Sequence, residues 1–230
     1  MSGIGSRKAR ASLAVDLVIF DCDGVLVDSE MIACEIGAEA WCELGFNISA
    51  QDVAHHFIGV SVREWHAEVA RRSGITIPEG FEAAVEAKTK AAFTKMLRPM
   101  PGILKALAAI QMPVCVASNS TPDRIRHSLS LVGLIDHFEP HIFSASMVKR
   151  GKPAPDLFLF AAAEMGVDPP RCVVVEDSVP GTQAAASAGM AVLGFCGGSH
   201  CTAEHSDRLL REGAMLTWTD MARLPEILNA

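Results

Sequence analysis

The chain contains short, continuously apolar runs that alternate with longer stretches whose apolar residues recur every three or four positions. Four of the runs are typical of buried strands: residues 16–20, 113–118, 172–176 and 190–195. They lack the polar alternation of a half-exposed strand, which indicates parallel strands that helices cover on both faces. A weaker run at 142–144 is a candidate for a further strand.

Helical patterns lie between these apolar runs. Residues 121–133 begin with a threonine and a proline and end at a glycine, which are typical helix start and stop signals. Further helices are expected over residues 155–166 and 179–189. Because strands and helices alternate, the sequence predicts an α/β fold with a doubly wound, Rossmann-like parallel sheet.

Residues 29–98 have a different pattern, with several helical stretches and no run that looks like a buried strand. The segment 98–102, Arg-Pro-Met-Pro-Gly, marks the return to the sheet. The sequence therefore predicts a core domain built from residues 1–28 and 99–230. A small all-helical domain, residues 29–98, is inserted after the first strand.

Charge and hydrophobicity exclude several classes of partner. The net charge of −7 argues against nucleic-acid binding, which needs a basic face. No stretch approaches the roughly 18 apolar residues of a membrane span. The seven cysteines are odd in number and form no C-x-x-C pair, which favours reduced, packed thiols. We therefore predict a soluble, cytoplasmic protein, a monomer or weak dimer, without nucleic-acid or membrane partners.

The N-terminal residues 1–14 are basic and rich in small residues, like the opening of a signal peptide. The apolar run behind them is interrupted by Asp16 and Asp21, so no continuous hydrophobic region follows. We predict a frayed leader at this end.

Polar residues gather where the predicted strands end, which is where ligands bind in an open α/β sheet. Several carboxylates in one crevice repel each other, and a hard dication such as Mg²⁺ resolves that conflict. A lysine and a hydroxyl-rich turn remain free to hold a phosphate. The serine and asparagine also suit an ordinary turn, and the last two acids also suit a helix cap. The residues concerned are Asp21, Asp23, Ser118, Asn119, Lys152, Glu176 and Asp177.

Four motifs carry a resemblance to a known family: DCDGVLVDS (21–29), VASNS (116–120), GKPAPD (151–156) and VVVEDS (173–178). Together and in this order they closely resemble the haloacid dehalogenase superfamily of phosphotransferases. The helical insert is similar to the cap domain of its β-phosphoglucomutase-like branch.

The resemblance implies a role for each polar residue at the strand ends. Asp21 is the nucleophile that forms an aspartyl-phosphate, and Asp23 is the general acid and then the base. Ser118 and the Asn119 main chain bind the phosphate, and Lys152 pairs with Asp21 and that phosphate. The implied Mg²⁺ ligands are Asp21, Asp177 and the Asp23 carbonyl, with Glu176 a ligand or an acid behind the ligands.

The choice of reaction depends on a few further positions. Dehalogenases of the family usually lack the second aspartate, so Asp23 argues against that activity. Related mutases clamp a second phosphate at positions that fall here on Ala33, Ile58 and Val62, none of which can bind phosphate. We therefore predict a phosphatase of a small phosphorylated metabolite, a sugar or sugar-acid phosphate. A sugar-phosphate mutase that uses Arg63 is the alternative, and a non-catalytic binding or regulatory module is more remote.

The sequence pattern also predicts positions or roles for several other residues. Asp28 and Ser29 are expected to close a turn and start the first helix of the insert, and the functional alternative is a hinge between insert and core. His55, His56 and His66 have no zinc-ligand spacing and are expected on the solvated surface of the insert. His200 and His205 flank Cys201 without a recognisable triad partner. The residues of the insert that can face the substrate are Glu30, His55, Arg63 and Trp65.

Overall fold

The computed structural model describes residues 15–57 and 62–229. Its centre is a six-stranded sheet in which all paired strands run parallel, in the order β3-β2-β1-β4-β5-β6. The strands are β1 (Leu17–Phe20), β2 (Val114–Ser118), β3 (Ile142–Ser144), β4 (Cys172–Glu176), β5 (Ala191–Phe195) and β6 (Leu216–Trp218).

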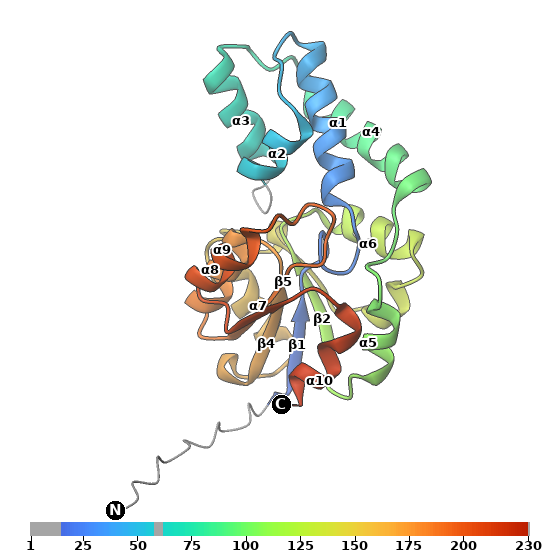
Figure 1. Cartoon of the computed structure of the whole chain (residues 1–230), viewed down its shortest axis with the longest axis vertical. Coiled ribbons are helices and arrows are strands. Elements are labelled where there is room, and N and C mark those ends of the chain that lie inside the picture. The colour runs from blue at the N-terminus through green and yellow to red at the C-terminus, as the bar shows by residue number, and fades with distance from the viewer. Residues whose placement is uncertain (1–14, 58–61, 230) are drawn as a thin grey trace, which may run out of the picture.

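Helices cover both faces of this sheet (Figure 1). One face is packed by α5 (Ile103–Ala109), α6 (Pro122–Leu131) and α10 (Leu224–Leu228). The other is packed by α7 (Asp156–Glu164), α8 (Val179–Ser187) and α9 (His205–Arg211). Four 3₁₀ turns complete the connections: η1 (Ile135–His137), η2 (Ala145–Met147), η3 (Pro169–Arg171) and η4 (Met221–Arg223).

The continuous apolar runs follow from this double covering. Val18 and Phe20 of β1 belong to the hydrophobic cluster on one face, whereas Leu17 and Ile19 belong to the cluster on the other. All four side chains are fully buried, so neither face can carry polar residues. The doubly wound parallel sheet predicted from the sequence is confirmed.

The edge strand β6 was not predicted. Its three residues show no recognisable pattern of apolar and polar positions, and two of them are only partly buried. A short strand paired on one side gives too few apolar positions to be recognised by pattern. The weak run at 142–144, by contrast, forms β3 with the predicted bounds.

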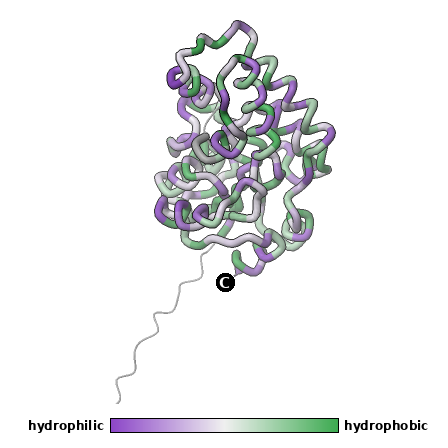
Figure 2. Tube along the Cα trace, turned by 45° about the horizontal axis from the view of Figure 1, so that its top comes forward, coloured by the Kyte–Doolittle hydropathy of each residue, from purple (hydrophilic) through white to green (hydrophobic). Residues whose placement is uncertain are grey.

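The first four of the described helices after β1 form a separate helical part of the molecule, which we call the cap (Figure 1). Trp41, Trp65 and Val69 lie at the centre of its own hydrophobic cluster. Figure 2 shows hydrophilic turns along the outside of both the cap and the sheet part. The division at residues 28 and 99 stays a prediction, which this separate cluster supports. The cap helices are α1 (Glu30–Glu43), α2 (Ala50–Phe57), α3 (Val62–Ser73) and α4 (Phe81–Met96).

The two chain segments that join the cap to the sheet lie side by side. Val27 forms an isolated bridge with Pro99, and the Asp28 amide donates to the Arg98 carbonyl over 3.1 Å. The cap is therefore joined to the sheet through two paired segments beside the end of β1.

Some predictions fall outside the described residues. These are the N-terminal leader, Ile58, and the side chains of His55, His56, Val62 and Arg63. Within the described ranges, none of the helices combines the length and apolarity that crossing a membrane requires.

The predicted surface position of His66 is wrong. Its ring is fully buried against Trp41, Trp65 and Phe81, with centroid separations of 5.9, 4.3 and 5.1 Å. Neither ring nitrogen has a hydrogen-bond partner among the described residues. Burial lowers the pKa of His66 to about 4, because a charged imidazolium would lose its hydration there.

This burial predicts an acid-sensitive cap. Between about pH 6.5 and pH 4 the unfolded chain protonates His66 and the folded cap does not, so the free energy of unfolding falls as pH decreases. The loss attributable to His66 is up to about 3 kcal/mol. Urea unfolding at pH 7.5 and pH 5, followed by tryptophan fluorescence, to which Trp41 and Trp65 of the cap contribute, measures it. His66→Phe is expected to reduce this pH dependence of the free energy of unfolding, and the exposed His137→Gln is expected to keep it. An equal change in the free energy of unfolding between the two pH values in both variants contradicts the account.

Candidate active site

Pairing of β1 with β4 brings the predicted carboxylates together. The Asp21 amide donates to the Val175 carbonyl over 3.0 Å, which continues the ladder past the end of β1. Asp21 therefore lies beside Glu176 and Asp177 at the carboxyl edge of the sheet. Carboxylate oxygens of these three residues come within 4.8 Å of one another, and all three side chains are buried.

Lys152 lies among these acids. Its Nζ is 2.9 Å from Asp21 Oδ1 and 2.6 Å from Glu176 Oε1, and its side chain is 2% exposed. Burial alone lowers the pKa of Lys152, but attraction to Asp21 and Glu176 outweighs burial and raises the pKa well above its usual value. The lysine is therefore a fixed positive charge at neutral pH.

Asn119 fixes the loop that carries this lysine. Its Oδ1 accepts from the Lys152 amide over 2.9 Å, and its Nδ2 donates to the Lys152 carbonyl over 3.1 Å. The side-chain amide thus pairs with both main-chain groups of one residue, as a residue of a neighbouring strand would. The sequence assigned only the Asn119 main chain to the site, so this side-chain role is a new observation.

Both carboxylate oxygens of Glu176 accept hydrogen bonds. Oε1 accepts from Lys152 Nζ, and Oε2 accepts from the Ser178 amide over 2.7 Å and the Ser178 hydroxyl over 2.9 Å. A Cβ on Gly181 would lie 1.8 Å from Oε1, so only glycine leaves room for this carboxylate. Of the two roles predicted for Glu176, the geometry favours the acid that holds Lys152 over a metal ligand.

The remaining acids fit a metal ion. Lys152 offsets one of three buried carboxylates, and burial together with the neighbouring acids raises the pKa of Asp177 well above its usual value. Burial likewise raises the pKa of Asp21, although Lys152 opposes that effect. A site with excess negative charge and an all-oxygen donor set suits a hard dication such as Mg²⁺. Asp21 and Asp177 are the side chains that fit it.

Asp23 is held by two hydroxyl groups. Ser29 donates to Oδ1 and Ser120 donates to Oδ2, each over 2.7 Å. Ser29 precedes the first cap helix and Ser120 follows β2, so the carboxylate connects the start of the cap to the loop after β2. Ser118 is also buried at the end of β2, where its hydroxyl accepts from the Ser120 amide over 3.2 Å.

Arg124 was missed by the sequence analysis. It lies on α6 with its guanidinium 3.3 Å from Glu86 of α4 and 4.0 Å from Asp23 Oδ1. Its Cζ also lies 5.1 Å from the centre of the Phe93 ring. An arginine on an amphipathic helix carries no local signal of such contacts, because its partners are more than thirty residues away.

Four cap residues were candidates for facing the substrate. Among those whose side chains the structure describes, Glu30 lies near the acids. Burial raises the pKa of Glu30 to about 8, and the charges of Asp23 and Asp177 add to that effect. Trp65 instead packs inside the cap cluster. The side chains of His55 and Arg63 lie outside the description.

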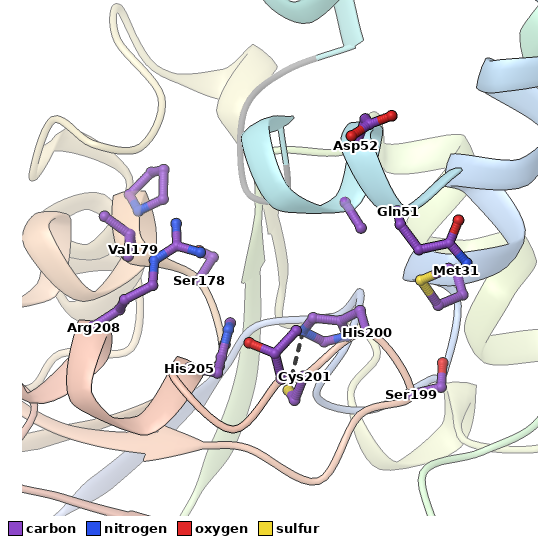
Figure 3. A pocket seen from close by; sticks show the side chains of 13 residues that line it. Met31, Gln51, Asp52, Ser178, Val179, Ser199, His200, Cys201, His205 and Arg208 are labelled. Carbon is purple, nitrogen blue, oxygen red and sulfur yellow. Dashed lines mark hydrogen bonds between the residues drawn. The ribbon is translucent and has the colours of Figure 1, made fainter. Parts of the chain in front are cut away.

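A cavity of about 580 Å³ opens between the cap and the core next to these acids. The cap contributes residues of α1 and α2, and the core contributes α8, α9 and the loop after β5 (Figure 3). Arg208 of α9 points into it beside Val179 and Ser178. The lining is Met31, Gln51, Asp52, Ala54, Ser178, Val179, Pro180, Ser199, His200, Cys201, Thr202, His205 and Arg208.

An open parallel sheet with buried acids and a lysine at its strand ends defines a Rossmann-like enzyme of the α/β class. The chain belongs to the haloacid dehalogenase-like hydrolase family, whose model matches residues 15–189. The resemblance predicted from the four motifs is confirmed.

Three similar proteins extend this match beyond the motifs. The chain is 32% identical over 217 residues to a 6-phosphogluconate phosphatase of Escherichia coli, covering 94% of this chain and 96% of that one. A haloacid dehalogenase-like protein of unknown function from Agrobacterium tumefaciens matches in structure with a TM-score of 0.83 and 39% identity, over 93% and 97% of the two chains. A hydrolase of the same family from Deinococcus radiodurans, solved with bound phosphate and sodium, matches with a TM-score of 0.74 and 35% identity, over 92% and 94%.

The electrostatics of Lys152 generate a prediction about stability. Lys152→Met leaves the buried carboxylates without their cation, so in EDTA the free energy of unfolding should fall by about 3–5 kcal/mol. Added Mg²⁺ should restore part of it, because an ion that binds only the folded state stabilises that state. Urea titrations with and without Mg²⁺ measure both effects. The exposed Lys149→Met is the control, expected within about 0.5 kcal/mol; equal stability of the two variants in EDTA contradicts the prediction.

Proposed function

We propose that this protein is a Mg²⁺-dependent phosphatase that hydrolyses a small phosphorylated sugar or sugar acid through an aspartyl-phosphate on Asp21. The observation that carries the proposal is the buried contact of Asp21 with Lys152, beside Asp177 and the hydroxyl-held Asp23. The name of the Escherichia coli relative and the phosphate bound by the Deinococcus relative support it. A cytoplasmic location and a monomer or weak dimer complete the proposal.

In the first step, an Asp21 oxygen attacks phosphorus and the bond from phosphorus to the sugar oxygen breaks. Asp23 gives a proton to the departing oxygen, which otherwise leaves as an unstable alkoxide. Lys152 faces Asp21 and offsets charge on the transferring oxygens. Asp21, Asp177 and the Asp23 carbonyl would hold Mg²⁺, which would supply further positive charge for the same purpose.

In the second step, a water molecule attacks the phosphorus of the aspartyl-phosphate. Asp23 accepts the proton of that water, and the bond from phosphorus to Asp21 breaks to release inorganic phosphate. Ser29 and Ser120 suit both steps, because a hydroxyl can donate to a carboxylate or accept from a carboxylic acid. They keep Asp23 in place while its protonation changes.

We propose a phosphatase, which transfers the phosphoryl group to water, instead of a mutase, which transfers it between positions of a sugar. A mutase must hold a second phosphate with cationic groups while it excludes water. Of the three positions compared, only Ala33 has a described side chain, and it packs against the main hydrophobic cluster. Its methyl group can donate no hydrogen bond to a phosphate.

This reasoning predicts the fate of the phosphoenzyme. We expect release of inorganic phosphate from sugar phosphates. Little glucose 6-phosphate should form from β-glucose 1-phosphate, even with glucose 1,6-bisphosphate as primer. Parallel assays for phosphate and glucose 6-phosphate on one preparation measure both, with Asp21→Asn as the inactive control. Isomerisation faster than phosphate release overturns the hydrolase and favours the mutase alternative.

The cavity favours a substrate with a second anionic end. Arg208 is the cationic side chain that lines it, and no ion-pair partner of this guanidinium is present among the described residues. A carboxylate on the far end of a sugar acid pairs well with a guanidinium. We therefore include sugar-acid phosphates among the proposed substrates because of Arg208.

Arg208 gives a prediction about specificity. Arg208→Gln should raise KM for 6-phosphogluconate roughly ten- to a hundredfold, the worth of about 1.5–3 kcal/mol for a hydrogen bond to a charged group. KM for a hexitol phosphate, which lacks the carboxylate, should change little. Arg211→Gln, an exposed change on the same helix, is the matched control. Equal effects of Arg208→Gln on both substrates remove the sugar-acid assignment and leave the phosphatase proposal standing.

A further inference from the structure

His200 makes an unexpected contact with the acid site. It lies in the loop between β5 and α9, and its Nε2 is 3.0 Å from Asp177 Oδ2. The two side chains are 0% and 1% exposed. This loop is distant from all four family motifs in the sequence, and its histidine was left without a role by the sequence analysis.

Two glycines make room for this ring. A Cβ on Gly198 would lie 2.6 Å from His200 Cε1, and a Cβ on Gly24 would lie 3.0 Å from the same atom. Gly24 follows Asp23, and its Cβ would also lie 1.9 Å from Asp177 Oδ2. The imidazole and the Asp177 carboxylate therefore share one tight space at the end of β1.

The loop that carries His200 is fastened on two sides. Asp28 Oδ1 accepts from the Ser199 amide over 3.0 Å and from the Ser199 hydroxyl over 2.8 Å. On the other side, His205 Nε2 contacts the main-chain carbonyl of Asp177. The Asp177 residue thus meets one histidine at its side chain and another at its main chain (Figure 3 shows both rings).

We propose that His200 is a positioning residue that holds the Asp177 carboxylate in the orientation needed to bind Mg²⁺. The inference rests on the proposed function, because that function requires the metal. Asp177 Oδ2 is buried without a hydrogen-bond partner among the described residues, and His200 Nε2 is the nitrogen that contacts it, over 3.0 Å. A carboxylate among like charges turns away from them unless a neutral or positive group fixes it. Groups that orient metal ligands in this way typically change metal affinity 10- to 100-fold.

The alternative role for His200 is that of a ligand to a softer metal ion. The Cys201 sulfur lies 3.3 Å from His200 Nε2, and ligand atoms of His200, Cys201 and His205 come within 4.8 Å of one another. Thiolate and imidazole together suit a softer metal such as Zn²⁺ or Co²⁺. The positioning role is favoured because Nε2 of His200 and Nε2 of His205 already face oxygens of Asp177.

The experiment measures metal binding directly, without turnover. Mn²⁺ stands in for Mg²⁺, and the electron paramagnetic resonance signal of free Mn²⁺ gives the Kd for each variant. His200→Ala is expected to weaken Mn²⁺ binding roughly 10- to 100-fold. His200→Gln, whose amide nitrogen can occupy the place of Nε2, should recover most of the affinity. His141→Gln, an exposed change, should bind Mn²⁺ as the wild type does.

A second measurement separates positioning from a merely structural effect. At saturating Mg²⁺ the His200→Ala variant should regain most of its kcat, because the metal then occupies the site despite the loose carboxylate. Wild-type Mn²⁺ affinity in both His200→Ala and His200→Gln overturns the inference and leaves the proposed function intact. Absence of Mn²⁺ binding by the wild type overturns both.

Co²⁺ tests the softer-metal alternative. A thiolate-to-cobalt charge-transfer band in the wild type that disappears in Cys201→Ser would make His200 a ligand and overturn its positioning role. A Co²⁺ spectrum of oxygen ligation alone, unchanged in Cys201→Ser, supports the inference. Cys42→Ser, which removes an exposed thiol of the cap, is the matched control.

Discussion

The contact of Lys152 with Asp21 and Glu176 is the interaction on which the rest of the site depends. A buried ammonium needs carboxylate partners, and buried carboxylates need a cation, so none of the three can be lost alone without a large penalty. Around this contact, Asn119 fixes the lysine main chain and Ser178 occupies the second oxygen of Glu176. The polar residues at three strand ends are thereby joined into one network. We propose that Asp21, beside this lysine, makes the nucleophilic attack, and that Asp21 and Asp177 bind the metal.

The cap and the core meet in this network through the linkers at the end of β1. Asp23 takes a hydrogen bond from Ser29, at the start of the cap, and lies 4.0 Å from Arg124, which contacts Glu86 of the cap. Asp28, in the same linker, holds the loop that carries His200. The cap and its linker therefore contact both the proposed general acid and the loop beside Asp177.

The sequence predicted most of the sheet and the acids at its edge, because both depend on local pattern and on the rule that parallel strands end together. Runs buried on both faces are continuously apolar, and Asp21, Glu176 and Asp177 follow such runs directly. Contacts between distant segments could not be predicted in the same way. Arg124 meets Glu86, and His200 meets Asp177, only because the chain folds back, and neither residue has a local motif. The predicted surface position of His66 was wrong because the sequence does not show that aromatic side chains of other helices surround it. β6 was missed because its three residues carry too little pattern.

The central claim is that Asp21 carries the phosphoryl group between substrate and water, and direct detection of that group tests it most closely. Enzyme mixed with a sugar phosphate and Mg²⁺ is quenched in acid within the first turnover, digested, and analysed by mass spectrometry. The account predicts a phosphoryl group on the peptide that contains Asp21 and Asp23, with fragmentation assigning it to Asp21. Asp23→Asn should keep this phosphopeptide when the leaving group is an aryl oxide, which needs no protonation. Turnover without any phosphorylated peptide, or a phosphoryl group on another residue, would contradict the account.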